Sequence, residues 1–136
     1  DSTEKGKLSS EVDLLDKSQV DMLLMSIAQV MERTETVCAP DFSLTMLAQL
    51  VGSNTKYVSW VINTKYGKNF KTFLNEYRIR TASQMLVNTE KYGNLTIATI
   101  AERVGYKSPA SFHLAFKKVY CMTPAVYIKL ARQKED

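Results

Sequence analysis

The chain has 136 residues, of which 45% are hydrophobic and 24% are charged, enough for one globular domain or two small ones that share a core. No apolar run approaches the roughly 18 to 20 residues that a membrane span requires, and no charged and apolar leader precedes a cleavage site. We therefore expect a soluble, cytoplasmic segment without membrane contact. A sensor part elsewhere in a full-length protein could still be membrane-bound or exported.

The net charge of +4 hides an uneven distribution along the chain. Residues 1–41 hold four basic and nine acidic side chains, whereas residues 42–136 hold fourteen basic and five acidic ones. A basic surplus confined to one segment is typical of a nucleic-acid binder. A solvated, lysine-rich face would give the same count, so charge alone leaves both interpretations open.

The sequence offers few groups for catalysis or metal binding. Cys38 and Cys121 form neither a disulfide framework nor a four-ligand zinc site, so we expect free thiols, a reducing compartment, no metal and no cofactor. The basic segment has no glycine-rich phosphate loop and no usefully spaced carboxylate pair, and its one nucleophile near a base is Cys121, close to His113. We therefore expect no enzyme.

The first part of the chain reads as a connection to an upstream region. Residues 1–17 are polar and resemble a linker, and because the first residue is Asp1 we expect a fragment of a longer protein. Apolar residues then recur at helical spacing over 18–33, with Ser18 as a candidate N-cap, which predicts a helix packed on the helices after it. Residues 34–42 are expected to be a connector.

Residues 43–65 have the pattern of a helix-turn-helix. Ala48 is followed four residues later by Gly52 and ten residues later by Val58, so two short apolar-faced helices must meet across a glycine turn. Only a small side chain at Ala48 lets the second helix approach, and Gly52 can adopt the left-handed backbone that ends a helix. Ser43 can cap the first helix.

The second helix of this motif, from its cap Asn54 to about residue 65, has a face directed away from the core. At 100° per residue, the side opposite its apolar residues carries Lys56, Ser59, Trp60 and Asn63. After Gly67 ends this helix, Asn69 can cap a long one with a broad apolar face over about residues 69–88.

The opening pattern then returns as an internal repeat, with Ala101 and Gly105 each 53 residues after their counterparts. Ser108 and Pro109 mark the start of its second helix, which runs to about residue 120. The closing apolar residue is Phe112, eleven after Ala101, so the second turn is one residue longer than the first.

The outward face of this helix corresponds by helical angle to that of the first motif. The positions of Lys56, Ser59, Trp60 and Asn63 are taken by Ala110, His113, Leu114 and Lys117. The two faces are therefore analogous but offer different chemistry. A last helix is expected to start at residues 123–124.

These residues resemble the AraC/XylS-type transcription regulators, whose DNA-binding domain holds two helix-turn-helix units joined by one long helix. The resemblance spans about residues 42–128 and is most specific in IAERVGYKSP at 100–109 and TPAVY at 123–127. Residues 61–79 resemble a subgroup in which this domain ends a larger signalling protein. The chain departs from the family pattern at Trp60, Leu114, Cys121 and Ile128, and Cys121 in place of glycine implies a strained or slightly reshaped turn.

The resemblance implies an all-α fold of about seven helices, with helix-turn-helix subdomains over 18–92 and 93–136. It also implies a sequence-specific double-stranded DNA-binding transcription regulator, an activator in signal transduction. Recognition helices at 54–65 and 108–120 would enter successive major grooves. The implied partners besides DNA are RNA polymerase and an upstream sensor or receiver domain of the same polypeptide.

Side-chain chemistry divides the candidate DNA contacts into two groups. Lysine can donate to guanine, asparagine can bond adenine bidentately, and an apolar side chain can lie against a thymine methyl. The candidates for base contacts are Lys56, Ser59, Trp60, Asn63, Ala110, His113 and Leu114. The candidates for phosphate contacts, which set register without reading sequence, are Thr55, Lys107, Ser108, Ser111, Lys117 and Lys118.

Several of these residues have a structural alternative. Trp60 and Leu114 could instead fold back onto a neighbouring helix, and His113 could be a surface residue without a role. Two arginines, Arg78 and Arg103, are expected to be structural. All six methionines are expected to fill gaps in or near the core. For the whole chain, the competing function is a helical interaction module whose basic face docks an acidic partner.

Overall fold

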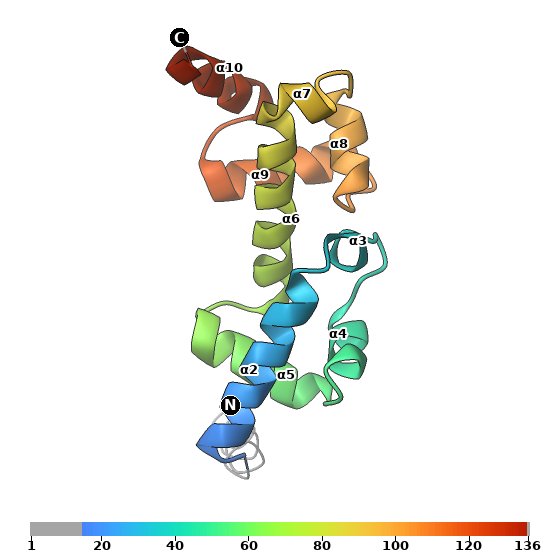
Figure 1. The fold of residues 1–136 in the computed structure, drawn as a ribbon, viewed down its shortest axis with the longest axis vertical. Coiled ribbons are helices and arrows are strands. Elements are labelled where there is room, and N and C mark those ends of the chain that lie inside the picture. The colour runs from blue at the N-terminus through green and yellow to red at the C-terminus, as the bar shows by residue number, and fades with distance from the viewer. Residues whose placement is uncertain (1–14, 136) are drawn as a thin grey trace. The chain divides into compact units, whose positions relative to one another are not determined.

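A computed structural model describes residues 15–135 (Figure 1), so all but the last three positions of the predicted linker lie outside it. The regular elements of that range are helices: α2 (Lys17–Met31), α3 (Thr34–Val37), α4 (Leu44–Leu50), α5 (Thr55–Val61), the π-helix η1 (Ile62–Tyr66), α6 (Phe70–Val87), α7 (Thr89–Tyr92), α8 (Ile97–Arg103), α9 (Pro109–Tyr120) and α10 (Pro124–Glu135). The all-α class is confirmed. The single-turn helices α3 and α7 and the π segment add to the seven or so helices expected. None of the described helices is long and apolar enough to cross a membrane.

The described residues form two compact units. One contains residues 15–33 and 43–73, and the other contains residues 34–42 and 74–135. Each unit holds one helix-turn-helix, and α6 has residues in both. The subdomain boundaries expected from the sequence stay a prediction, because compactness does not show that a unit folds by itself.

In the first unit, α2 packs on α4 and α5 (Figure 1). The helix starts at Lys17, because the cap is Asp16, two residues before Ser18. The Asp16 carboxylate accepts the Gln19 N–H at 2.8 Å, and the Gln19 side chain accepts the Asp16 N–H at 2.9 Å. This reciprocal capping box satisfies two otherwise free N–H groups, which a lone serine cannot do. The prediction of Ser18 as N-cap is therefore wrong, while the helix itself is confirmed.

The first helix-turn-helix has the expected caps and turn. The Ser43 and Asn54 side chains accept the N–H groups of the residues three positions later, at 3.2 and 2.9 Å. Gly52 has a φ of 68°, in the left-handed region, and the Ser53 N–H returns to the Ala48 carbonyl at 2.9 Å. Ala48 is buried, as close helix packing requires.

The second helix of this motif is not α-helical throughout. An α-helix was expected over 54–65, but α5 ends at Val61 and the π-helix η1 carries the chain to Gly67, whose φ is 69°. Wider hydrogen-bonded turns of this kind often occur at functional sites. Asn69 then caps α6 as predicted, accepting the Thr72 N–H at 2.9 Å.

The second unit encloses one hydrophobic core. Helix α9 runs across α6 (Figure 1), and α8 packs against α9. The buried core residues are Cys38, Ile79, Ala82, Leu86, Ile100, Ala101, Val104, Tyr106, Phe112, Ala115 and Phe116. Since Cys38 belongs to this core, the segment predicted as a connector is partly packed rather than a simple link.

The predicted repeat is confirmed in the backbone of the second turn. Gly105 has a φ of 102°, and the Tyr106 N–H bonds to the Ala101 carbonyl at 3.0 Å, matching the first turn. Ser108 caps α9 with Pro109 as its first residue, so this turn is one residue longer, as expected. Cys121 ends α9 with a φ of 59°, which confirms that a strained residue stands where glycine is usual.

Two methionines are wrongly predicted. Met22 and Met25 are 67% and 64% exposed on α2, whereas Met31 on the same helix is buried. The helical period places Ile27 and Met31 on the inner side, and no further element covers the side that carries Met22 and Met25 among the described residues. The free thiols expected at Cys38 and Cys121 are confirmed.

Candidate nucleic-acid interface

Helix α9 separates its side chains into a buried and an exposed face. Phe112, Ala115 and Phe116 are buried, because they fill the core of the second unit. The four residues predicted to face outward, Ala110, His113, Leu114 and Lys117, are all exposed. Leu114 is 65% exposed, so it does not fold back onto another helix. These four side chains are therefore accessible to a binding partner.

The start of α9 combines a closed cap with exposed cations. The Ser108 hydroxyl accepts the Ser111 N–H at 3.2 Å, and the Ser111 hydroxyl donates to the Ser108 carbonyl at 2.9 Å. Both hydroxyls are therefore already used in the cap, so a phosphate would have to share them. Lys107 precedes the cap and Lys118 lies further along the helix, and both are exposed.

His113 has one ring nitrogen fixed by its own helix. Its Nδ1 lies 2.8 Å from the carbonyl oxygen of Pro109, four residues earlier. Because a carbonyl can only accept, Nδ1 carries the proton, and a neutral ring then presents Nε2 as an acceptor. An outward acceptor can bond the amino group of adenine or cytosine in a major groove.

The outward face of the first motif is more covered than that of α9. Thr55 and Lys56 are exposed, whereas Ser59 and Trp60 are half-buried. Half-burial of Trp60 means that part of the ring packs on the protein and part remains available. A base contact by Trp60 therefore stays a prediction.

Asn63, the fourth residue of that face, lies in η1 rather than in α5. Its Nδ2 donates to the Ser59 carbonyl at 2.9 Å and lies 3.4 Å from the Ser59 hydroxyl. The Asn63 amide oxygen takes part in neither bond. A bidentate contact with adenine needs this oxygen together with an N–H of Nδ2, so Nδ2 would have to give up or share its longer bond to the Ser59 hydroxyl.

The fold that carries these two faces occurs in known proteins. A family model described as a helix-turn-helix domain matches residues 47–130, more than half of the chain. A transcriptional regulator from Chromobacterium violaceum with an AraC-type DNA-binding domain has the same fold, with a TM-score of 0.70, 20% identity and coverage of 82% of this chain and 93% of that one. The chain belongs to the AraC-type helix-turn-helix family.

Two further proteins show what this AraC-type chain is similar to. It is 29% identical to the HTH-type transcriptional regulator GlxA of Rhizobium meliloti over 99 residues, which are 73% of this chain and 29% of GlxA. It superposes on the C-terminal domain of AraT, a response regulator from Geobacillus stearothermophilus, with a TM-score of 0.66 and 27% identity over 80% of this chain and 84% of that one. The chain thus spans less than a third of the length of GlxA.

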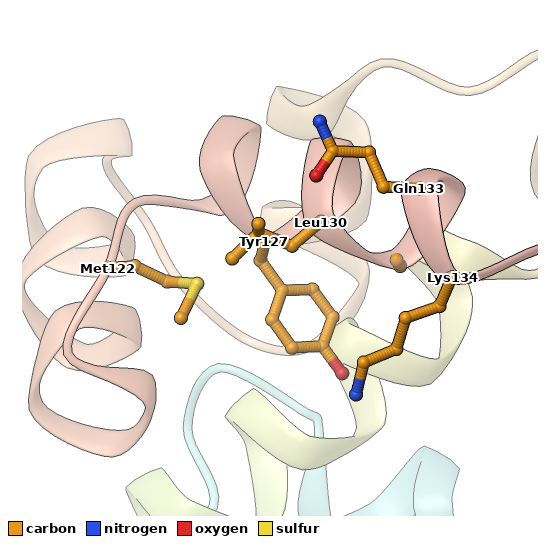
Figure 2. A pocket seen from close by; sticks show the side chains of 6 residues that line it. Met122, Tyr127, Leu130, Gln133 and Lys134 are labelled. Carbon is orange, nitrogen blue, oxygen red and sulfur yellow. The ribbon is translucent and has the colours of Figure 1, made fainter.

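A depression of about 480 Å³ on α10 of this AraC-type chain lies apart from the candidate contacts. Figure 2 shows the Tyr127 ring between the Met122 and Lys134 side chains, with Leu130 and Gln133 above it. Its walls are mainly apolar and share no residue with either outward face. Within residues 15–135, no group of three or more His, Cys, Asp or Glu side chains could hold a metal ion.

A buried polar cluster behind α9 includes residues that the sequence did not single out. Arg78 is 7% exposed and donates to two backbone carbonyls, which confirms its structural role, whereas Arg103 is exposed. Tyr106 is also buried and donates its hydroxyl to Asn75 at 2.8 Å. The available signal was the spacing of Asn75 and Arg78, two polar residues three apart and so on one side of α6.

Burial determines the ionisation of this cluster. Desolvation raises the pKa of Tyr106 from 10.0 to about 12, opposed by the nearby positive charge of Arg78. Burial likewise raises the pKa of the Cys38 thiol and lowers the pKa of Arg78. All three shifts favour a neutral interior, and the two hydrogen bonds to carbonyls are what keep a guanidinium there.

Alkaline pH should therefore destabilise the folded second unit, because Tyr106 ionises more readily in the unfolded chain. In the unfolded chain this phenol ionises near pH 10, but in the folded chain it stays protonated to about pH 12, so the unfolded state loses its proton first. The free energy of unfolding should fall between these pH values, by up to roughly 2 kcal/mol. Urea unfolding of wild type and Tyr106→Phe at pH 8 to 11.5 checks this. Equal pH slopes for the two proteins would show that Tyr106 does not contribute.

Proposed function

We propose that this chain reads a specific double-stranded DNA site as the DNA-binding part of a transcription regulator, with α5–η1 and α9 as its two recognition helices in successive major grooves. The observation that carries the proposal is the repeat: two helix-turn-helix motifs with the same backbone bond in their turns, each with exposed side chains on its outward face. Membership of the AraC-type family supports DNA binding in general. Grooves on one face of a duplex recur every ~34 Å, so the expected site has two half-sites about one turn apart.

In this proposal the outward residues divide into those that contact bases and those that contact phosphates. Lys56, Asn63 and His113 make polar base contacts, while the apolar Leu114 lies against a thymine methyl. Lys118, with the other phosphate candidates, binds the DNA backbone and sets register. Since the chain supplies two different faces, it reads an asymmetric site without needing a second copy.

The partners are inferred from the relatives. AraT is a response regulator and the matching part is its C-terminal domain, so we assign an upstream sensor or receiver domain of the same polypeptide to this chain as well. We also assign contact with RNA polymerase, activation of transcription and a cytoplasmic location. The short share of GlxA that the chain spans agrees with a larger regulator.

Selection of bound sequences from a random DNA pool tests the function directly. The expected result is a motif with two half-sites about one helical turn apart. A poly-glutamate competitor, added to the same binding reaction, tests the alternative of an acidic protein partner. Displacement of DNA by poly-glutamate together with no recovered DNA motif would replace the DNA-reading function by the interaction module.

Asn63→Ala and Lys118→Ala should weaken DNA binding in different ways. The first removes a base contact, so it should cost roughly 1–3 kcal/mol on the selected site and relax preference at one base pair. The second removes a phosphate contact, so it should weaken all sequences alike and flatten the slope of log affinity against log salt by about one unit. Titrations at several salt concentrations, on the selected and a scrambled duplex, measure both. Uniform weakening by Asn63→Ala would exclude base reading at that position.

A further inference from the structure

The guanidinium of Arg78, on α6, touches two separate backbone segments. Its Nε donates to the Val37 carbonyl at 3.0 Å and its Nη2 to the Ala39 carbonyl at 2.6 Å, both in the segment Thr34–Phe42. A Cβ placed on Gly105 would lie 2.8 Å from the Arg78 Cζ and 2.7 Å from the Cys38 carbonyl oxygen. The turn that leads into α9 therefore passes directly against both the guanidinium and the segment it holds.

Two hydroxyl contacts from α6 complete the attachment of α9. Asn75, three residues before Arg78 and so on the same side of α6, accepts the Tyr106 hydroxyl at 2.8 Å. At the far end of α9, the Tyr120 hydroxyl lies 2.7 Å from the Ser83 hydroxyl. Arg78 and Asn75 thus hold the start of the recognition helix, and Ser83 holds its end.

Among residues 15–135, no comparable support meets the first helix-turn-helix turn. Its backbone bond from Ser53 to Ala48 matches that from Tyr106 to Ala101, at 2.9 and 3.0 Å. However, a Cβ on Gly52 would meet no atom within 4 Å, and Gly52 is exposed. The two turns share this backbone bond, but the second also packs against a buried cation from another helix.

We infer that Arg78 is a positioning residue for α9: it binds the Val37 and Ala39 carbonyls and packs against the Gly105 turn, and so sets the orientation in which α9 meets base edges. This inference rests on the proposed function of α9 as a recognition helix. Base contacts need side chains held to within about half an ångström, and an exposed helix face cannot supply that precision from its own cap. A buried residue that faces no base would then decide how well one half-site is read.

Base discrimination separates positioning from simple stabilisation. A variant that is merely less stable has less folded protein, which lowers its affinity for every DNA sequence by the same factor. The ratio of affinities for a correct and an incorrect base is then unchanged. A variant whose α9 is misoriented loses that ratio at the half-site that α9 reads and keeps it at the half-site read by α5–η1.

Arg78→Lys is the variant of choice, because it keeps the positive charge but cannot reproduce the two-pronged contact with the carbonyls. Tyr106→Phe, which keeps the guanidinium and loses only the hydroxyl bond to Asn75, serves if the first does not fold. Affinities are measured for duplexes carrying single base changes in each half-site of the selected sequence. We expect discrimination to fall about tenfold in the α9 half-site, the equivalent of one base contact, and to stay constant in the other. Equal losses in both half-sites, or preserved ratios, would overturn the inference.

Amide hydrogen exchange, measured without DNA, tests whether Arg78 positions α9 independently of the proposed function. The matched pair is the Tyr106 N–H, which bonds Ala101, and the Ser53 N–H, which bonds Ala48. In Arg78→Lys, exchange should become faster at Tyr106 and the first turn of α9 and remain constant at Ser53. Unchanged exchange at Tyr106 refutes positioning by Arg78. If the wild-type chain shows no base preference at all, the proposed function fails, and the exchange result alone decides the role of Arg78.

Discussion

Gly105→Ala is expected to destabilise the chain much more than Gly52→Ala, although both replace a glycine with positive φ in a helix-turn-helix turn. At Gly52 the added methyl meets no atom within 4 Å, so the cost is the strain of a left-handed alanine, about 1 kcal/mol. At Gly105 the φ of 102° is less favourable, and the methyl would lie 2.7 Å from the Cys38 carbonyl oxygen. A backbone carbonyl cannot move aside cheaply, so the total should reach about 3 to 4 kcal/mol.

Urea unfolding followed by circular dichroism measures both variants. Trp60 fluorescence reports only on the first unit, because it is the single tryptophan and lies there, and so it serves as the second probe. The Gly105 variant should lower the midpoint of the helical signal more than the Gly52 variant does. Similar losses for the two glycine variants would mean that the second turn has room to relax.

Phe116→Ala should strongly destabilise the second unit, with Leu114→Ala as its control two residues away. Phe116 is fully buried and its ring centre lies 5.0 Å from that of Tyr120 and 5.5 Å from that of Tyr127. Its removal takes away a large apolar area and leaves a cavity, at a cost of about 3 to 5 kcal/mol. Leu114 is 65% exposed, so its truncation should change stability by less than about 0.5 kcal/mol.

In DNA binding, Leu114→Ala should have the larger effect on base preference, although Phe116→Ala has the larger effect on stability. Under conditions in which both are folded, Phe116→Ala should keep the base preference of the wild type. Leu114→Ala should lose preference for thymine at one position of the α9 half-site. If Leu114→Ala keeps the wild-type base preference at every position, Leu114 does not contact a base.

Most of the local structure was predictable from residue spacing. The two glycine turns 53 residues apart and the helix starts at Ser43, Asn54 and Ser108 all depend on interactions between residues at most five apart in the chain. Side-chain type at fixed spacing is sufficient for such features. Sequence also separated the exposed face of α9 from its buried face, because the helical period decides that division.

The wrong sequence predictions concern features for which neighbouring residues compete, or which depend on residues distant in the chain. Asp16 rather than Ser18 caps α2, because Gln19 forms reciprocal hydrogen bonds with Asp16. Met22 and Met25 are apolar side chains on a helix whose partners cover only one side. The π-helical segment Ile62–Tyr66, which follows α5, has no recognised local signal in the sequence.

The sequence by itself determined the family, the doubled motif and the residues that face outward, because each depends on contacts within a turn or two of helix. Only the tertiary structure decided how the second motif is held. The bonds from Arg78 to Val37 and Ala39 join residues 41 and 39 positions apart, and that from Tyr106 to Asn75 joins residues 31 apart. No periodicity encodes such pairings. They arise because a buried guanidinium must find acceptors, and in this fold the carbonyls of Thr34–Phe42 are the acceptors within its reach.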